Sequence, residues 1–267
     1  MHPPYVIIHK SRGETPLAAV EAWKREHPEL ASLRTAYAGR LDPMAEGSLL
    51  VLLGDECKKQ DTYTGLDKEY EIEVVLDLST DTGDALGLSS YEGRVTHPTT
   101  LKQALRAVTG TRLVPYPAFS SKTVGGKQLF QYALEGTLDT IRIPEHEETV
   151  YRIGHLKTAE LATGALRERI EDALRVVPRS DEPSKVLGAD FRQDAVRAAW
   201  RSLFEVLPER TFTVLTLRVA SASGTYMRTL SGRIAQEFGT QGFALSICRT
   251  RIGAYRKLGP LGYWREL

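Results

Sequence analysis

Two segments with alternating apolar and polar side chains place the strongest constraint on the fold. They cover residues 69–78 (EYEIEVVLDL) and 212–220 (FTVLTLRVA). A period of two is typical of strands, because successive side chains of a strand point to opposite faces of a sheet. In the second segment Val214, Leu217 and Val219 do not share one strict face, so we expect either a β-bulge or burial on both faces.

Helical patterns occur in other parts of the chain. Thr15 and Pro16 are typical of an N-cap followed by the first helical residue, which predicts a helix over residues 16–26. We expect further helices at 101–108, 130–135 and 226–238, and further strands at 5–9, 49–53 and 150–153. The chain is therefore predicted to mix helices and strands.

Residues 139–210 differ in sequence pattern from the rest of the chain. Two segments, 156–174 and 190–207, combine helical spacing with many charges, and a Pro- and Ser-containing stretch at 176–185 separates them. Neither segment carries a chemical motif. We predict a single domain over residues 1–267 with a helical insertion at about 139–210.

Composition indicates a soluble, cytoplasmic protein. Hydrophobic residues make up 42% of the chain and charged residues 26%, which is ordinary for a globular protein. No apolar run approaches the roughly 18 residues of a membrane helix, and the N-terminus lacks the features of a signal peptide. Cys57 and Cys248 lie far apart in no paired spacing, so we expect two reduced thiols and no metal site.

The net charge is only +1, but the charge is unevenly distributed. Residues 210–267 contain nine basic and two acidic residues. Such an excess can form a phosphate-binding face, because each neutralised phosphate releases counterions. The alternative is a set of arginines scattered over a solvated surface.

The loop at residues 37–47 (YAGRLDPMAEG) carries the first candidate for chemistry. Its glycines and proline are explained by a turn, but a turn does not require Arg40 or Asp42. A carboxylate fixed in a loop before a buried strand suits a nucleophile or a base, and a neighbouring arginine keeps a carboxylate ionised. Asp42 is thus either a turn residue or a catalytic one.

The strand predicted at 69–78 and the turn after it form a second motif. The ring of Tyr70 either packs in the core or stacks on a base. The following TDTGDALG lacks the acid spacing of a calcium loop, so Asp81 and Asp84 are predicted to cap a turn.

Basic side chains mark three remaining motifs. Residues 115–136 form a basic loop suited to an RNA backbone. In residues 221–239 the N-terminus of a predicted helix and Arg228 would together attract an anion, either a phosphate or the carboxylate of Asp42. In residues 247–255 (ICRTRIGAY) Arg249 and Arg251 alternate along a predicted strand and so point to opposite faces. The basic residues singled out in these motifs are Lys122, Lys127, Arg228, Arg249 and Arg251, and all of them except Arg228 are candidate RNA-binding residues.

Taken in order, six motifs resemble those of the TruB family of pseudouridine synthases. They are HKSRGETP, YAGRLDPMAEGSLLVLLGDECKK, KEYEIEVVLDLSTDTGDALG, PAFSSKTVGGKQLFQYALEG, SGTYMRTLSGRIAQEFG and CRTRIGAY. The resemblance covers residues 5–138 and 210–257. It implies an α+β pseudouridine synthase fold, in which helices flank a mixed, mostly antiparallel sheet with a central active-site cleft. It also implies isomerisation of the uridine at position 55 in the T-loop of tRNA, with no metal or organic cofactor.

The resemblance implies roles residue by residue. Asp42 falls on the family's catalytic aspartate, which attacks the target nucleotide either at the ribose C1′ or at the base C6. Tyr70 falls on the tyrosine that stacks on the flipped uracil and takes part in proton handling. Arg228 falls on the arginine that pairs with the catalytic aspartate. Lys10 matches the lysine of the N-terminal K-P-x-G motif, although Ser11 replaces the proline, and it is a candidate RNA-binding residue.

Several positions depart from the family pattern. YAG stands where the family usually has His-[Ser/Thr]-Gly, so the histidine that helps to flip the base is missing and Tyr37 is a candidate replacement. Arg40 completes an R-L-D triplet that resembles the RluA family, and it is either a second clamp on Asp42 or a residue that intrudes into the RNA. FSSKT replaces Y-S-A-x-K, so the lysine is shifted to Lys122 or lost, and ICRT is one arginine short of L-R-R-T.

The resemblance also implies partners. The T-arm of tRNA is the expected substrate, bound by a monomer with no obligate protein partner and no membrane. About ten residues follow the last core motif, so we expect no C-terminal PUA domain, and the insertion at about 139–210 is a candidate substitute in gripping tRNA. Two alternatives stay open: a pseudouridine synthase that acts on a different RNA, and a non-catalytic protein that binds or folds tRNA.

Overall fold

A nine-stranded sheet forms the centre of the computed structural model, which describes residues 2–93, 99–177, 192–258, 261–265 and 267. Its strands are β1 (Tyr5–Lys10), β2 (Thr35–Ala38), β3 (Glu46–Leu53), β4 (Asp67–Leu76), β7 (Gly110–Pro115), β10 (Glu145–Ala162), β11 (Thr211–Ser221), β12 (Gly242–Leu258) and β13 (Leu261–Arg265). The order is β1-β3-β12-β4-β11-β10-β7, with β2 on β3 and β13 on β12. Two small hairpins lie outside it: β5 (Ser79–Thr80) with β6 (Ser89–Ser90), and β8 (Thr123–Val124) with β9 (Lys127–Gln128).

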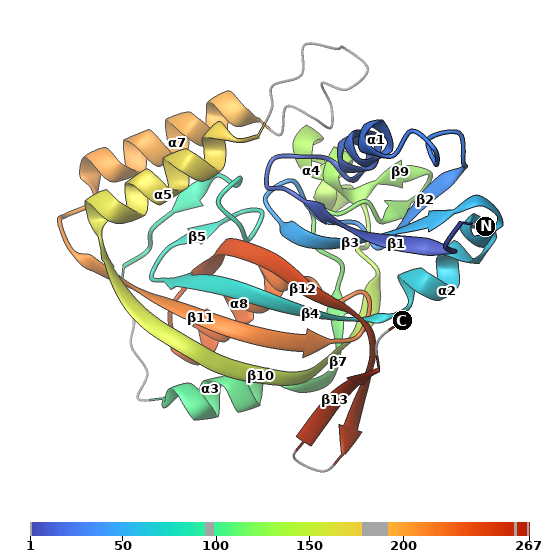
Figure 1. The fold of residues 1–267 in the computed structure, drawn as a ribbon. Coiled ribbons are helices and arrows are strands. Elements are labelled where there is room, and N and C mark those ends of the chain that lie inside the picture. The colour runs from blue at the N-terminus through green and yellow to red at the C-terminus, as the bar shows by residue number, and fades with distance from the viewer. Residues whose placement is uncertain (1, 94–98, 178–191, 259–260, 266) are drawn as a thin grey trace.

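The contact between β3 and β12 divides this sheet into two parts. It is parallel and pairs Cys248 with Glu46 and Arg249 with Gly47, whereas the other strand pairs described are antiparallel. On one side lie β1, β2 and β3, and on the other lie β4, β7, β10 and β11 (Figure 1). The loop that carries Asp42 enters β3 at this junction.

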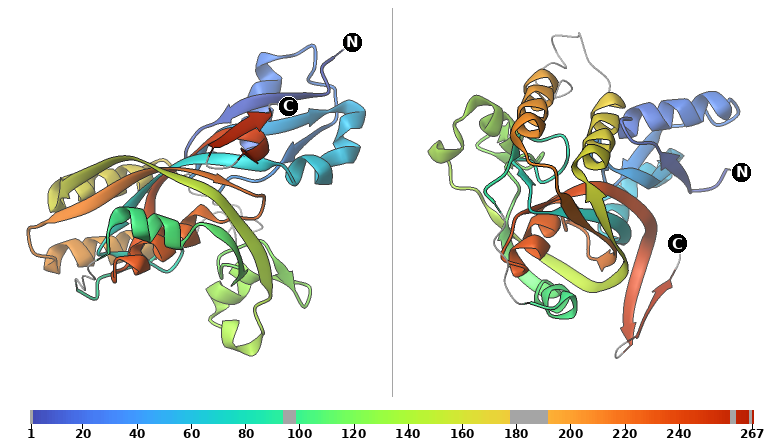
Figure 2. Two further views of the ribbon diagram at one scale, coloured as in Figure 1. Left: turned by 90° about the horizontal axis from the view of Figure 1, so that it is seen from below. Right: turned by 90° about the vertical axis from the view of Figure 1, so that its left-hand side faces the viewer.

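Helices cover both faces of the larger part of the sheet. The helices are α1 (Pro16–Glu26), α2 (Gln60–Thr64), α3 (Leu101–Ala107), α4 (Leu129–Glu135), α5 (Thr163–Arg175), α7 (Gln193–Val206) and α8 (Met227–Glu237), with 3-10 turns η1 (Gly54–Lys59) and η2 (Leu138–Thr140). Helices α5 and α7 run side by side and share a core with Val75 and Phe243 (Figure 1). Helices α3 and α8 pack with Ile72 and Val74 on the opposite face (Figure 2).

Strand β11 is buried on both faces. Phe212 and Val214 pack under α5 and α7, whereas Leu215 and Leu217 pack under α3 and α8. Its register with β4 runs without a shift from Val214 to Ser221. Of the two explanations for its irregular alternation, burial on both faces is therefore confirmed.

The first predicted helix is confirmed in detail. Helix α1 covers Pro16–Glu26, and the hydroxyl of Thr15 accepts a hydrogen bond from the backbone N–H of Ala18 over 3.1 Å.

None of the helices in the described ranges combines the length and the hydropathy needed to cross a membrane.

The predicted helical insertion at about 139–210 is wrong over its first part. Glu145–Ala162 is the long strand β10, which pairs with β7 and with β11. Residues 157–162 (KTAELA) include good helix formers, but pairing with β11 overrides this weak preference. After the 3-10 turn η2, the α-helical structure within the described part of this segment begins at Thr163 and comprises α5 and α7. Most of the loop predicted at 176–185 lies outside the described residues.

Candidate active site

A cavity of about 680 Å³ opens beside the junction of β3 and β12. Segments that are far apart in the sequence line it, among them residues 39–43, 119–121 and 223–228. The cavity brings together six of the predicted site residues: Tyr37, Arg40, Asp42, Tyr70, Arg228 and Arg249.

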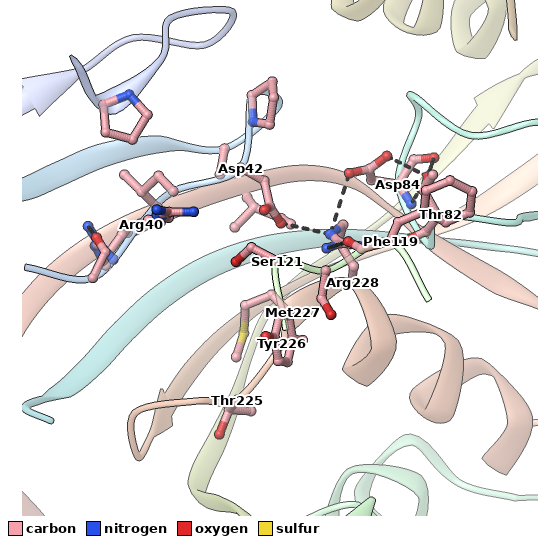
Figure 3. Close-up of a pocket in the computed structure, with 18 of the residues that line it drawn as sticks. Arg40, Asp42, Thr82, Asp84, Phe119, Ser121, Thr225, Tyr226, Met227 and Arg228 are labelled. Carbon is pink, nitrogen blue, oxygen red and sulfur yellow. Dashed lines mark hydrogen bonds and ion pairs between the residues drawn. The ribbon is translucent and has the colours of Figure 1, made fainter. Parts of the chain in front are cut away.

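Asp42 and Arg228 form an ion pair in the wall of this cavity (Figure 3). Nε of Arg228 donates to Oδ2 of Asp42 over 2.7 Å, although 186 positions separate the two residues. The Asp42 side chain is 43% exposed, whereas that of Arg228 is 5% exposed. The carboxylate thus faces the open cavity, and the guanidinium holds it from the protein side. Of the two anions predicted for this helix N-terminus, the carboxylate of Asp42 is the one bound.

The other nitrogens of Arg228 fix its orientation. Nη1 donates to the carbonyl of Thr82 over 2.6 Å, and Nη2 donates to the carbonyl of Phe119 over 3.0 Å. Burial lowers the pKa of Arg228, but the attraction of Asp42 and Asp84 outweighs burial, and the pKa is raised. Arg228 is therefore a fixed cation whose position depends on the two loops that supply these carbonyls.

A second carboxylate, that of the buried Asp84, lies near the same arginine. Its Oδ2 lies 3.7 Å from Nε of Arg228, and its Oδ1 accepts from the hydroxyl of Thr82 and from the N–H of Leu86. Burial raises the pKa of Asp84 to about 6, which the charge of Arg228 opposes. The predicted turn cap is confirmed, but sequence reasoning missed the contact with Arg228. The signal was an acid inside TDTGDALG, whose burial the sequence does not reveal.

The turn that carries Asp84 lies directly against helix α8. Gly83 has a φ of +78°, and a Cβ at this position would lie 2.9 Å from the carbonyl oxygen of Arg228. Glycine both permits the left-handed backbone and leaves room for the helix. The approach places the carbonyl of Thr82 and the carboxylate of Asp84 within reach of the Arg228 side chain.

Two buried cations brace the backbone of the Asp42 loop. Nζ of Lys10 donates to the carbonyls of Asp42 and Ala45, over 3.3 and 2.6 Å, and burial lowers the pKa of Lys10 to about 8. Arg249 donates from Nε to the carbonyl of Ser48 over 2.7 Å and from Nη2 to the carbonyl of Gly39 over 3.0 Å. Lys10 and Arg249 are 0% and 1% exposed, so the structure places both predicted RNA-binding residues inside the protein.

Besides Lys10, three predicted RNA-binding residues do not line the cavity. A register shift between Arg249 and Arg251 leaves the first buried and the second exposed, 3.8 Å from Glu69. Lys127 forms an ion pair with Glu135. Lys122 lies over the ring of Tyr116, 4.9 Å from its centroid.

Tyr70 lies between the core and the cavity. Its half-buried ring packs against the core under α3 and α8 and also lines the cavity. Lys68 and Tyr226 line the cavity as well and were not predicted. Burial lowers the pKa of Lys68 to about 7. Burial, followed by the charge of Asp42, raises the pKa of Tyr226.

Arg40 lies exposed at the cavity and is labelled beside Asp42 in Figure 3. Among the described residues no ion pair joins it to Asp42, whose partner is Arg228. Tyr37 is partly buried in the same wall. Both side chains therefore face the space that a substrate would enter.

Metal ligands are not grouped in the part of the chain that the structure describes. No cluster of three or more His, Cys, Asp or Glu side chains there is arranged to hold an ion. Cys57 and Cys248 are free thiols. The side chains that line the cavity include carboxylates, arginines, a lysine and phenols.

Sequence comparison agrees with this geometry. A family model described as TruB family pseudouridylate synthase (N terminal domain) matches residues 28–176, which is more than half of the 267 residues. The chain belongs to the TruB family. The match includes the TruB segments that carry Asp42, Tyr70, Asp84 and the loop at 119–121.

Individual relatives extend the TruB match along the chain. This chain is 29% identical to the tRNA pseudouridine synthase B of Aromatoleum aromaticum over 252 residues. The alignment covers 94% of this chain and 63% of the relative. This chain is 30% identical to the tRNA pseudouridine synthase B of Bacillus pumilus over 167 residues. That alignment covers 61% of this chain and 52% of the relative. The chain thus spans between about half and two thirds of the length of these two curated relatives.

A solved structure shares the fold. The protein in the crystal structure of a Cbf5-Nop10-Gar1 complex superposes with a TM-score of 0.52 at 17% identity, over 92% of this chain and 48% of that one. The predicted fold class, an α+β pseudouridine synthase fold with a mixed and mostly antiparallel sheet, is confirmed.

Proposed function

We propose that this protein isomerises uridine to pseudouridine in the T-loop of a tRNA, at position 55, with Asp42 as the nucleophile. The observation that carries the proposal is the Asp42–Arg228 ion pair, which presents a half-exposed carboxylate to a cavity. The relatives named tRNA pseudouridine synthase B support the substrate class. A cavity of about 680 Å³ falls within the range of about 300–1,000 Å³ that is usual for small-ligand sites, which suits one flipped nucleotide.

The reaction exchanges one bond to the ribose for another. The Asp42 carboxylate attacks the target nucleotide at the ribose C1′ or at the base C6, and the bond from C1′ to N1 breaks. The uracil turns within the cavity, and C5 bonds to C1′. The bond to Asp42 breaks, which restores the carboxylate, and the proton on C5 leaves while N1 gains one. The net change is an isomerisation, so neither an oxidant nor water is consumed.

Other cavity residues fit steps of this sequence. A uridine in a folded loop must leave its stack, at a cost of a few kcal/mol, and the ring of Tyr70 offers a replacement surface. The Tyr70 hydroxyl is our candidate for handling the C5 proton. Arg228 stabilises the charged form of Asp42 before attack. Lys10 and Arg249 contribute by holding the loop rather than by touching RNA, since both are buried.

Arg40 and Tyr37 are our candidates for replacing the missing histidine. Arg40 is exposed and makes no ion pair with Asp42 among the described residues, which favours intrusion into the RNA over a second clamp. Lys122, Lys127 and Arg251 lie outside the cavity, and we propose that they meet the RNA backbone farther from the target base.

We further propose that residues 1–267 act as one catalytic unit, as a monomer in the cytoplasm. The cavity wall combines residues from position 16 to position 249, which supports a single unit. The free thiols Cys57 and Cys248 fit a reducing compartment.

The test is release of tritium from a T-arm stem-loop labelled at C5 of uridine, compared with the same stem-loop carrying cytidine at the target position. Release from the first RNA alone supports the proposal. Exposed Arg40 in an R-L-D triplet keeps a second candidate open, a synthase for a different RNA. Inactivity on every T-arm, together with modified sites elsewhere in cellular RNA, would favour that candidate.

A further inference from the structure

The helical pair α5 and α7 reaches the active site through one arginine. Arg192 stands immediately before α7 as its N-cap. Its side chain is 23% exposed and lines the cavity. The pair is also tied to the turn after Asp84, because the indole N–H of Trp200 donates to the carbonyl of Ala85 over 3.0 Å.

Arg192 connects two loops that do not otherwise belong to the helical pair. Its Nη1 donates to Oδ2 of Asp81 over 2.8 Å. Its guanidinium carbon lies 4.5 Å from the centroid of the Phe119 ring, within the range of a cation–π contact. Asp81 precedes Thr82, and the carbonyls of Thr82 and Phe119 are the two acceptors that orient Arg228. The guanidinium of Arg192 thus joins the two loops whose carbonyls orient the guanidinium of Arg228.

The backbone at this position does not favour arginine. Arg192 has φ 57° and ψ 32°, in the left-handed region, and makes no side-chain hydrogen bond as the N-cap of α7. Glycine and asparagine adopt this conformation most easily, and asparagine is also a good N-cap. A residue retained against its local preference points to a role for its side chain.

We propose that Arg192 is a positioning residue for the Asp42–Arg228 pair, so that helices α5 and α7 form part of the active-site wall. This inference rests on the proposed function for its kinetic readout. Release of the Phe119 loop from the Asp81 turn would move the carbonyl acceptors of Arg228. Misplacement of catalytic groups by about 1 Å costs up to about a hundredfold in rate, so we expect kcat to fall about tenfold to a hundredfold and KM to stay within about twofold.

The variants are chosen so that folding and positioning separate. Arg192→Gly suits the left-handed backbone and should unfold close to the wild-type temperature. Arg192→Lys keeps a cation for Asp81 but loses the planar stacking on Phe119, so it should recover part of kcat. Arg201→Ala, an exposed arginine on the same helix, is the matched control and should leave kcat unchanged.

The measurements are steady-state kinetics on a T-arm RNA and the ¹⁵N–¹H resonance of the Arg228 Nε–H, assigned by its loss in Arg228→Lys. We expect Arg192→Gly to lower kcat and shift this resonance, while Arg201→Ala changes neither. An unchanged resonance in Arg192→Gly would overturn the inference, and a raised KM with normal kcat would assign Arg192 to RNA binding instead. Because the resonance needs no turnover, inactivity of the wild-type protein would count against the proposed function alone.

Discussion

Replacement of Arg228 by methionine should damage both the fold and the chemistry, for separable reasons. The Arg228 side chain is 5% exposed and lies 2.7 Å from Asp42 and 3.7 Å from Asp84. Without it, Asp84 would remain buried with no cation beside it. Removal of one partner of a buried ion pair costs about 3–5 kcal/mol of the free energy of unfolding. We expect a loss in this range in urea denaturation at neutral pH.

The same substitution removes the cation that faces the nucleophile. Two unit charges about 4 Å apart attract by about 4 kcal/mol at an effective dielectric constant of about 20. The Asp42 side chain is 43% exposed, so water screens part of this attraction and about 2–4 kcal/mol is a reasonable range. Single-turnover tritium release should therefore slow by about thirtyfold to a thousandfold.

The double variant Arg228→Met/Asp84→Asn separates the two effects. It removes the stranded carboxylate together with the arginine, so most of the lost stability should return. The rate should stay as low as in Arg228→Met, because Asp42 still lacks its partner. Recovery of the rate in the double variant, or wild-type stability in the single one, would refute this reasoning.

Two further variants test individual features. Burial raises the pKa of Asp84 to about 6, so its protonation stabilises the fold at low pH and this contribution is lost as the pH rises through about 6. Asp84→Asn should abolish that pH dependence, about 2–3 kcal/mol at most, in urea denaturation at pH 4.5 and 7; a dependence equal to wild type would contradict it. Gly47 has a φ of +107°, and its Cβ would lie 2.3 Å from the carbonyl oxygen of Arg249. Gly47→Ala should cost roughly 2–4 kcal/mol of stability, whereas exposed Gly164→Ala, with open space around it, should cost nothing.

Local sequence signals predicted the elements that local chemistry determines. The Thr15-Pro16 signal gave the start of α1, and the alternating segments gave β4 and β11. The strand β10 was missed over residues 157–162 because its lysine, alanine and glutamate favour a helix in isolation. These residues form a strand because they pair with β11, which lies 49 to 59 positions farther along the chain. A local sequence pattern does not reveal such pairing.

The site residues that lie in recognisable sequence motifs could be predicted. The Asp42–Arg228 pair was expected from the charged helix N-terminus and from the TruB resemblance, and the structure contains it. Asp84 and Arg192 were missed because their roles depend on burial and on contacts between distant loops. Lys10 and Arg249 were expected to bind RNA, but in the structure both side chains are buried and donate hydrogen bonds to backbone carbonyls.

The most direct test of the central claim is pseudouridine formation by Asp42→Asn. Asparagine keeps the size of the side chain and a hydrogen-bonding oxygen for Arg228, but it lacks the nucleophilic charge. We predict that the variant binds T-arm RNA with nearly wild-type affinity and releases no tritium above background. Pseudouridine formation at a measurable rate by a variant free of wild-type protein would show that Asp42 is not the nucleophile.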